Sequence, residues 1–331
     1  MAMRASTEAF AYRYADYGDA DVLHRHRYPL PAPGPGEVLV EVISTAINHM
    51  DAFLRNGKED TWRDDPWPRS SGSDFAGIVR RCGPGVTTLR IGANVVGHTR
   101  TGAHASHIVL PADQLVVKHR AIEWEVAGGL FLAGGTALET LDDLRIGASD
   151  TVVISAAAGG VGSIEAQVAK YRGARVIGTC GERNFDYLRQ LRITPVNYGE
   201  GMAERIQRVA GGPITAYIDN YGKDGREVAE ALEVAPERYR SSADRREVEL
   251  RLLRDDAESV SHATHVLQRV VDLAGAGAFR LLVSGLYPIE DIVDAFEDLA
   301  KLHARGKIVL ATHPVTRTRT LRAREVFERM P

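Results

Sequence analysis

The stretch Thr151-Val-Val-Ile-Ser-Ala-Ala-Ala-Gly-Gly-Val-Gly-Ser163 decides how this chain is organised. It begins with β-branched apolar residues that favour a strand, passes through a glycine-rich turn and continues into the helix-like residues 164–171. Glycines leave the backbone N–H groups open to a pyrophosphate, and the N-terminus of a helix faces that anion with a partial positive charge. The pattern predicts a dinucleotide-binding turn formed by Ala158, Gly159, Gly160, Val161 and Gly162.

The residues after this turn support the same interpretation. Gly173-Ala-Arg-Val-Ile-Gly-Thr179 ends the helix and supplies a second strand. The whole unit then has roughly thirty residues, the length of a βαβ mononucleotide-binding half. Because the glycine spacing departs from the common G-x-G-x-x-G, a structural turn without a ligand is the alternative.

Length and composition limit the possible classes of protein. A chain of 331 residues favours two domains, and 44% hydrophobic with 26% charged residues is typical of a globular protein. The net charge of −3 and the lack of a long apolar run lead us to expect no nucleic-acid or membrane partner. The N-terminus lacks the apolar core of a secretory signal, and the only cysteines, Cys82 and Cys180, lie far apart, so we expect a cytoplasmic protein.

The pattern of predicted elements changes along the chain. Short β runs broken by glycines dominate residues 37–110 and predict a small, irregular barrel. After residue 127, helical stretches alternate with strands at 151–156, 175–179 and 216–220, which predicts an α/β fold with a parallel, doubly wound sheet. The highly charged residues 236–256 interrupt this pattern, and we expect an edge strand or an exposed excursion there.

Several different short motifs follow one another along most of the chain. They are Pro33-Gly-Pro-Gly-Glu-Val-Leu-Val40, Asn48-His-Met-Asp51 with Arg55 and Gly57, Gly72-Ser-Asp-Phe-Ala-Gly-Ile-Val79, Gly92-Ala-Asn-Val-Val-Gly97, Gly135-Thr-Ala137, Ala157-Ala-Gly-Gly-Val-Gly162 and Arg305-Gly-Lys-Ile-Val-Leu310. Together they resemble the medium-chain dehydrogenase/reductases, specifically the zinc-independent quinone oxidoreductase branch with its zeta-crystallins and enoyl reductases. The resemblance implies a GroES-like β-barrel catalytic domain formed by residues 1–127 and 278–331, and a Rossmann dinucleotide-binding domain at 128–277. It also implies a substrate cleft at their junction and a homodimer.

The end of the second Rossmann strand bears on the choice of cofactor. An NAD-selective site usually has an acidic residue about twenty residues past the glycines. Thr179 stands near that position here, and Arg183 offers a guanidinium suited to a 2′-phosphate, so we expect NADPH. The preference would reverse if the carboxylate of Glu182 faced the ribose instead.

The family resemblance adds three residues to the expected cofactor site. It implies that Tyr198 lies near the 2′-phosphate, that Thr136 lies near the nicotinamide, and that Lys307 lies near the cofactor phosphates or the cleft rim. Packing at a strand end is the alternative for Tyr198. An exposed lysine at the start of a strand is the alternative for Lys307.

We expect no metal site from the sequence. Zinc-dependent relatives carry a cysteine ligand near residues 46–51 and a lobe with four cysteines, and this chain has neither. Histidine is a common zinc ligand, so His98, His104 and His107, with His49 in the cleft motif, are the remaining possibility. We expect these histidines to be polar barrel positions, with His49 the one to test.

These observations predict an NADPH-dependent oxidoreductase that delivers hydride to a conjugated carbonyl, either a quinone or an α,β-unsaturated ketone or enoyl substrate. Asn48 matches a family residue at the nicotinamide end and could donate to the developing oxyanion, His49 could protonate the product, and Asp51 would orient Asn48 or the barrel backbone. Alternatively, residues 48–51 only cap a helix.

Two other functions stay open. The family often has a tyrosine where this chain has Phe53, which favours a non-catalytic NADPH-binding protein of the crystallin type. The charged residues 236–256 favour a specialised biosynthetic reductase with a tailored substrate.

Overall fold

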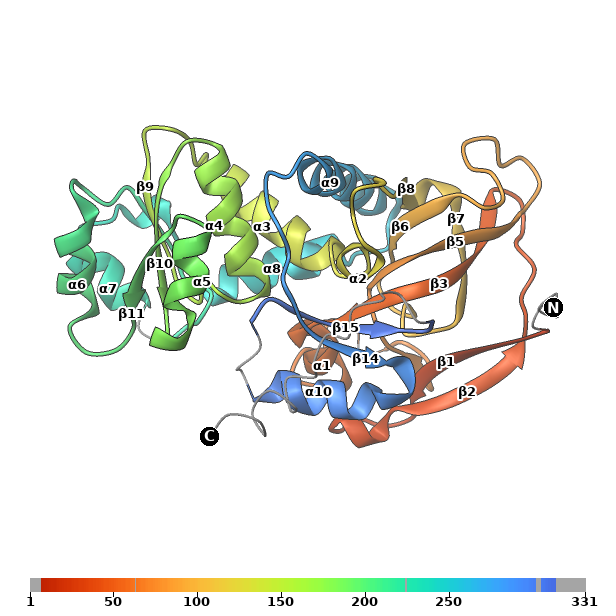
Figure 1. The fold of residues 1–331 in the computed structure, drawn as a ribbon. Coiled ribbons are helices and arrows are strands. Elements are labelled where there is room, and N and C mark those ends of the chain that lie inside the picture. The colour runs from red at the N-terminus through yellow and green to blue at the C-terminus, as the bar shows by residue number, and fades with distance from the viewer. Residues whose placement is uncertain (1–6, 63, 224, 302–304, 314–331) are drawn as a thin grey trace. The chain divides into compact units, whose positions relative to one another are not determined.

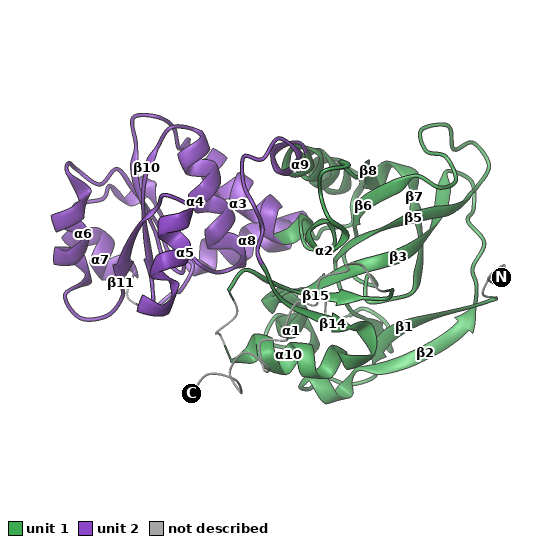
Figure 2. Ribbon diagram, in the orientation of Figure 1, with its two compact units in different colours: residues 1–132, 253–271, 283–331 green, residues 133–252, 272–282 purple. Residues whose placement is uncertain are grey.

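The chain forms two compact units in a computed structural model that describes residues 7–313 except 63, 224 and 302–304 (Figure 1, Figure 2). Unit 1 comprises residues 1–132, 253–271 and 283–331, and unit 2 comprises residues 133–252 and 272–282. The expected domains differ from these units chiefly at residues 253–271, which the family resemblance assigned to the Rossmann domain. Residues 314–331 of the expected catalytic domain lie outside the described residues.

Unit 1 is built on two β-sheets. The larger has the order β14 (Val283–Pro288), β15 (Lys307–Ala311), β3 (Glu37–Ile47), β5 (Asp74–Cys82), β6 (Asn94–His98) and β8 (Leu115–Val117), and β7 (His107–Pro111) also pairs with β3. The smaller has the order β2 (His24–Pro29), β1 (Glu8–Tyr14) and β4 (Arg69–Ser70). Most of these strands are short, as the glycine-interrupted sequence predicts, but β3 has 11 residues and β5 has 9.

Strand β3 is the centre of the larger sheet because it pairs antiparallel with β5, β7 and β15. Its register sets Ala46 opposite Asp74 of β5, and Ile47 opposite Ile308 of β15. The end of β3 therefore lies beside the start of β5 and the start of β15. Helix α1 (His49–Arg55) begins directly after this point.

The remaining helices of unit 1 cover its sheets. They are α2 (Trp124–Ala127), most of α9 (Ala257–Gly275) and α10 (Ile292–Ala300), and α3 (Phe131–Asp143) begins in this unit and continues into unit 2. The buried face of α10 packs on Tyr12 and Tyr14 of β1 and on Ile308 and Leu310 of β15. This apolar cluster holds the smaller sheet against β15.

Unit 2 contains the predicted parallel sheet. Its order is β11 (Thr194–Asn197), β10 (Arg175–Cys180), β9 (Thr151–Ile154), β12 (Ala216–Ile218) and β13 (Tyr239–Arg240), and every pair is parallel. Helices α4 (Gly160–Tyr171), α5 (Phe185–Gln190), α6 (Met202–Ala210) and α7 (Gly225–Ala231) connect or follow these strands. The chain moves outward from β9 through β10 to β11 and then returns to β12, so the switch point lies between β9 and β12.

The structure of the charged residues 236–256 differs in part from the expectation. Tyr239–Arg240 forms the expected edge strand, but Ser242–Leu252 forms helix α8 instead of an exposed excursion. The helix buries Val248 and Leu252, and Arg251 pairs with Glu139 of α3 at 2.9 Å. A few buried apolar contacts and ion pairs are enough to order a segment whose charge hides its helical pattern.

Among the residues that the structure describes, no helix is long and apolar enough to span a membrane.

Candidate active site and nucleotide site

The glycine turn joins β9 to α4 in the predicted strand–turn–helix arrangement. Gly159 is the N-cap residue of α4, and its N–H donates to the carbonyl oxygen of Ala156 at 2.9 Å. A Cβ on Gly162 would lie 2.6 Å from the same carbonyl oxygen, so this position has no room for a side chain. The first turn of α4 is thus drawn close to the end of β9, with the helix N-terminus at the carboxyl edge of the sheet.

The expected 2′-phosphate residues lie along the carboxyl ends of β10 and β11. Thr179 is buried near the end of β10, and Arg183 is exposed on the 3-10 turn Glu182–Asn184 that follows it. The carboxylate of Glu182 accepts a hydrogen bond from Asn197 Nδ2 at 3.3 Å. This contact turns the one acidic side chain of the 3-10 turn toward the end of β11.

Tyr198 and Thr136 occupy different surroundings. Tyr198 follows β11 and is exposed, and its hydroxyl oxygen lies 3.6 Å from where a Cβ on Gly181 would be, next to the end of β10. Thr136 is fully buried in α3. Tyr198 therefore lies near Thr179 and Arg183 in the chain fold, and Thr136 lies on a different element, α3.

Asp219, which follows β12, was not predicted from the sequence as a site residue. Its Oδ1 accepts hydrogen bonds from Ser155 Oγ at 2.9 Å and from the N–H groups of Tyr221 and Gly222 at 3.0 and 2.9 Å. Asp219 therefore fixes the turn after β12 to the end of β9, beside the switch point. An acidic residue directly after the apolar run at 216–218 was the available signal.

In unit 1, the structure gathers Asn48, Asp51, Asp74 and Lys307 into one group, which we call the Asn48 network. The backbone N–H of Asn48 donates to Asp51 Oδ2 at 2.7 Å, and Asn48 Nδ2 donates to Asp74 Oδ2 at 2.8 Å. Lys307 Nζ donates to Asn48 Oδ1 and to the carbonyl oxygen of Ile47, the latter at 3.0 Å. Asn48 is thus the N-cap residue of α1, but its side-chain amide is also held from two sides.

Asp74 is the second residue that the sequence analysis missed. Its side chain is 0% exposed, its Oδ1 accepts the backbone N–H of Leu132 at 2.6 Å, and its Oδ2 lies 3.7 Å from Lys307 Nζ. The motif at 72–79 contained this aspartate, but nothing in the motif indicated its partners.

Lys307 is buried, so the alternative of an exposed lysine at the start of a strand is wrong. It is only 5% exposed, and the contacts described above all lie within unit 1. The register of β15 against β3 explains this placement, because it sets the first residue of β15 beside the end of β3.

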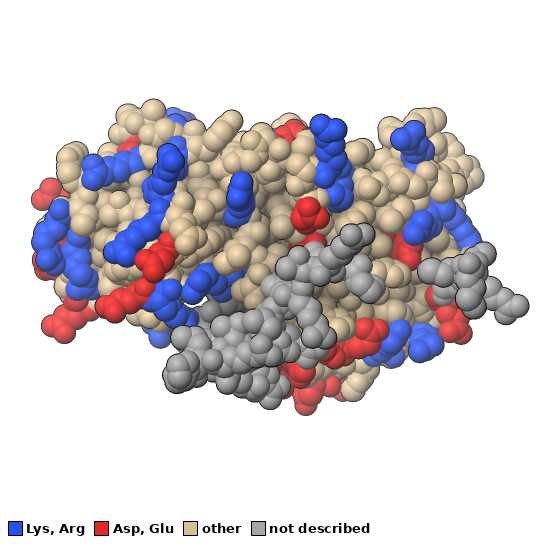
Figure 3. All heavy atoms as spheres, viewed as in Figure 1, with Lys and Arg blue, Asp and Glu red and all other residues tan. Residues whose placement is uncertain are grey.

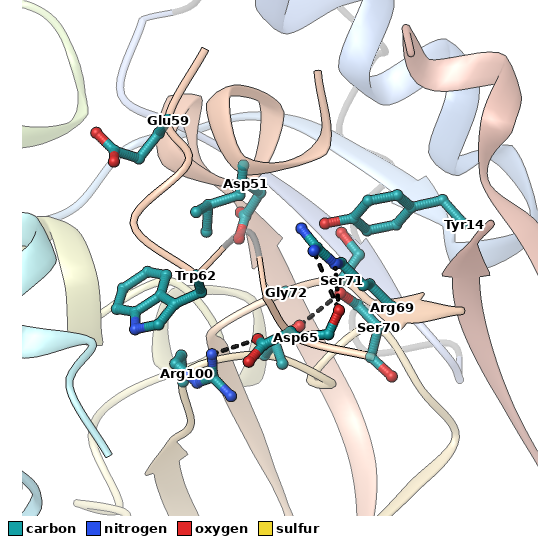
Figure 4. A pocket seen from close by; sticks show the side chains of 12 residues that line it. Tyr14, Asp51, Glu59, Trp62, Asp65, Arg69, Ser70, Ser71, Gly72 and Arg100 are labelled. Carbon is teal, nitrogen blue, oxygen red and sulfur yellow. Dashed lines mark hydrogen bonds and ion pairs between the residues drawn. The ribbon is translucent and has the colours of Figure 1, made fainter. Parts of the chain in front are cut away.

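Asp51 forms part of the wall of a small pocket in unit 1 (Figure 4). Tyr14, Trp62, Arg69 and Arg100 also line this pocket. Burial raises the pKa of Asp51 to about 7, the nearby charge of Asp74 adds to the rise, and the hydrogen bond from the Asn48 N–H opposes it. Asp51 therefore has an almost buried carboxyl group that changes charge near neutral pH.

The four candidate metal-ligating histidines do not share a site. His98 stacks on Phe131 with ring centroids 4.6 Å apart, and its Nε2 lies 2.8 Å from Thr264 Oγ1. His104 donates from Nε2 to the carbonyl oxygen of Ala46 at 3.1 Å. Burial lowers the pKa of both His98 and His104 to about 4, so both are neutral at pH 7.

The other two histidines also have separate surroundings. His107 lies on β7, and His49 lies on α1 with its ring centroid 6.5 Å from that of Phe53. Within the described part of the chain, no group of three or more His, Cys, Asp or Glu residues is arranged to hold a metal ion.

Comparison with known proteins assigns the family. Residues 34–121 match the family model of the alcohol dehydrogenase GroES-like domain, and residues 166–310 match that of the zinc-binding dehydrogenases. The chain belongs to the medium-chain dehydrogenase/reductase superfamily. The resemblance seen in the sequence is confirmed, and so is the fold class, a GroES-like domain joined to a Rossmann-type parallel sheet.

Among its relatives in this superfamily is the chloroplastic NADPH-dependent alkenal/one oxidoreductase of Arabidopsis thaliana, 29% identical over 93% of this chain and 80% of that protein. A quinone oxidoreductase of Salmonella typhimurium is 31% identical over 63% of this chain and 64% of that protein. The solved quinone oxidoreductase of Coxiella burnetii is similar with a TM-score of 0.76 and 25% identity, over 92% of this chain and 100% of that one.

The buried carboxyl group of Asp51 gives a pH-dependent prediction. Because its folded-state pKa of about 7 lies above the ordinary value of 3.8, the folded protein binds more protons than the unfolded chain between these pH values. The free energy of unfolding of the wild type should therefore fall as pH rises from 4 to 7, relative to that of Asp51→Asn. Urea denaturation of both proteins across this range measures the difference.

The exposed Asp113→Asn variant of the same unit is the matched control and should follow the wild type. A constant difference between wild type and Asp51→Asn across the range would contradict the raised pKa.

Proposed function

We propose that this chain is an NADPH-dependent oxidoreductase that delivers hydride to a conjugated carbonyl, a quinone or an α,β-unsaturated ketone or enoyl compound. The observation that carries the proposal is the Asn48 network, which holds a neutral amide donor in a fixed orientation. The relatives described above, named for quinone and for alkenal/one oxidoreduction, support the same reaction class.

The residues at the carboxyl edge of unit 2 fit a dinucleotide with a 2′-phosphate. The turn at 159–162 has a helix N-terminus, which suits a pyrophosphate, and the lack of room at Gly162 keeps this helix start against the end of β9. Thr179 replaces the acid that would repel a 2′-phosphate, Glu182 is bonded to Asn197, and Arg183 supplies an exposed guanidinium. NADPH, when bound, supplies the hydride.

The chain's own part in the chemistry is to stabilise negative charge on the substrate oxygen. Asn48 Nδ2 has two N–H groups, of which one donates to Asp74 at 2.8 Å and the other faces Ser73 Oγ at the long distance of 3.5 Å. We assign this second N–H to the substrate oxygen. Lys307 withdraws electron density from the amide by donating to its Oδ1, which strengthens the N–H as a donor.

Two further residues complete the assignment. Asp51 is a positioning residue, because it accepts the backbone N–H of Asn48 and so fixes the start of α1. His49, the next residue along α1, is assigned to protonation of the product.

We also propose that the reaction needs no zinc ion. In the Asn48 network, both carboxylate oxygens of Asp74 and Oδ2 of Asp51 already accept N–H groups of the protein. The ammonium of Lys307 lies 3.7 Å from Asp74 Oδ2, so a divalent cation there would meet a positive charge.

We also propose that the chain forms a homodimer in the cytoplasm. It has no nucleic-acid or membrane partner in this proposal. The dimer follows from the family resemblance, and the location from the use of only two cysteines. A net charge of −3 supports the lack of a nucleic-acid partner, and so do the interspersed basic and acidic side chains on the face shown in Figure 3.

A non-catalytic NADPH-binding protein is the second candidate. Phe53 favours it, because this residue stands where the family often has a tyrosine and supplies no phenolic proton donor. The assay below separates the two candidates.

An activity panel tests the proposed reaction. NADPH oxidation should occur with enones or quinones and should persist in the presence of a chelator. Asn48→Ala should lower kcat about 100- to 1000-fold, as expected for loss of one oxyanion donor. The exposed Asn94→Ala on β6 is the matched control and should leave kcat unchanged.

NADPH binding without oxidation across the whole panel would overturn the proposed enzyme and favour the non-catalytic candidate. Activity lost on chelation and restored by zinc would overturn the zinc-independent reaction.

The cofactor preference is tested by binding of NADPH and NADH. Arg183→Ala should weaken NADPH binding about 10- to 100-fold, because a charge-assisted hydrogen bond to phosphate is lost, and should leave NADH binding unchanged. Arg189→Ala, another exposed arginine of unit 2, is the control. Equal loss for both cofactors, or no loss, would show that Arg183 does not bind the phosphate.

A further inference from the structure

Two polar groups that are almost buried lie at the wall of the pocket in unit 1. Asp51 is 6% exposed and Tyr14 is 5% exposed. Figure 4 shows the carboxyl group of Asp51 and the hydroxyl group of Tyr14 both pointing into the pocket. Asp51 comes from the first turn of α1 and Tyr14 from the end of β1, and we call the two side chains the Asp51–Tyr14 pair.

The protein itself leaves part of the hydrogen-bonding capacity of this pair unused. Among the described residues, only Asn48 forms hydrogen bonds with the carboxyl group of Asp51, which has about four lone-pair sites. The hydroxyl group of Tyr14 makes no hydrogen bond to any residue that the structure describes. Because an almost buried polar group without a partner is costly, a ligand that supplies the partner gains affinity here.

The charges around the pocket favour a neutral ligand group. Arg69 and Arg100 line the pocket, so an ammonium group would be repelled. Glu59 and Asp65 line it as well, so a carboxylate would also be repelled. Arg100 already pairs with Asp65, and with Asp255 at 3.1 Å. The ligand group that fits is therefore polar and uncharged.

A hydroxyl group suits both members of the pair. Burial raises the pKa of Asp51 to about 7, so both forms of its carboxyl group are present at neutral pH. A hydroxyl group can donate to the ionised form and accept from the protonated form. Burial also raises the pKa of Tyr14 to about 12, Arg69 opposes this rise and Asp51 adds to it, so the phenol stays a donor.

The pair lies one helical turn from the proposed oxyanion donor. Asp51 follows Asn48 by three residues, a rise of about 4.5 Å along α1. In an enone with a hydroxyl group at C4, three carbon–carbon bonds separate C4 from the carbonyl carbon, so one small molecule spans both positions. The pocket has about 470 Å³ of unfilled space, part of it open to solvent, and Leu54 and Trp62 add apolar lining for the carbon skeleton.

We propose that the Asp51–Tyr14 pair binds a hydroxyl group of the substrate, and that the preferred substrates are hydroxylated enones. This inference rests on the proposed function, since it names the substrate class of the same site. Oδ2 of Asp51 keeps its role of positioning Asn48. The remaining acceptor capacity of Asp51 and the O–H of Tyr14 go to the substrate.

Steady-state kinetics with matched enones tests the inference. For the wild type, kcat/KM with 4-hydroxy-2-cyclohexenone should exceed that with 2-cyclohexenone about 10- to 100-fold, because one of the added hydrogen bonds is made to a charged group. The ether oxygen of 4-methoxy-2-cyclohexenone cannot donate, so this compound should lack most of the preference. Tyr14→Phe should reduce the preference about fivefold, as expected for loss of one neutral hydrogen bond.

Tyr12→Phe is the matched control. Tyr12 lies on the same strand and in the same apolar cluster as Tyr14 but does not line the pocket, so this variant should keep the wild-type preference. Tyr14→Phe should unfold at no lower urea concentration than the wild type. A lower midpoint would show that the hydroxyl group of Tyr14 has a structural partner, and would overturn its assignment to the substrate.

The outcomes distinguish this inference from the proposed function. Equal kcat/KM for the plain and the hydroxylated enone would overturn the inference and leave the proposed function standing, and so would turnover of quinones alone. A preference that Tyr14→Phe retains in full, or that the methoxy compound shares, would also overturn it. If no enone and no quinone is reduced, the proposed function fails and this inference fails with it.

Discussion

The buried carboxylate of Asp74 is the constraint on which unit 1 depends. It accepts N–H groups from Asn48 and Leu132 and pairs with Lys307, so it joins β5 to the start of α1, the start of α3 and the first residue of β15. A buried charge is costly unless it is paired and hydrogen-bonded. These four segments must therefore come together in one register before the charge is compensated.

The same constraint connects the fold with the proposed chemistry. The groups that compensate Asp74 also fix the amide of Asn48, so the candidate donor is held by the interaction that assembles the sheet. The carboxylate of Asp74 in turn contributes to the raised pKa of Asp51, which lines the pocket in Figure 4. In unit 2, Asp219 has a comparable role, because it fixes the turn after β12 next to the glycine turn.

Local patterns were sufficient to predict much of this architecture. The β-branched run at 151–154, the glycine turn and the later strands each carry their signal within a few residues, and the structure has the parallel sheet that they predict. Asp74 and Asp219 were missed because their roles depend on partners distant in the chain. Lys307 is the clearest example, since only the pairing of β15 with β3 shows that its ammonium is buried beside Asn48.

Helix α8 was not predicted from the sequence, because its local pattern is misleading. Its charges hide an apolar side of only a few residues, and its order depends partly on Glu139 of α3, which no local pattern reveals. The Asp51–Tyr14 pair likewise joins α1 to β1, two elements that are far apart in the sequence.

A double-mutant cycle on Asp74 and Lys307 tests the central claim most directly. Asp74→Asn and Lys307→Met each leave one buried charge without its partner, so each should lower the free energy of unfolding by about 3 kcal/mol in urea denaturation. The double variant has neither charge, and it should lose at least about 1 kcal/mol less than the sum of the two single losses. Losses that add within about 0.5 kcal/mol would show that the two charges do not interact, and would contradict this account of unit 1.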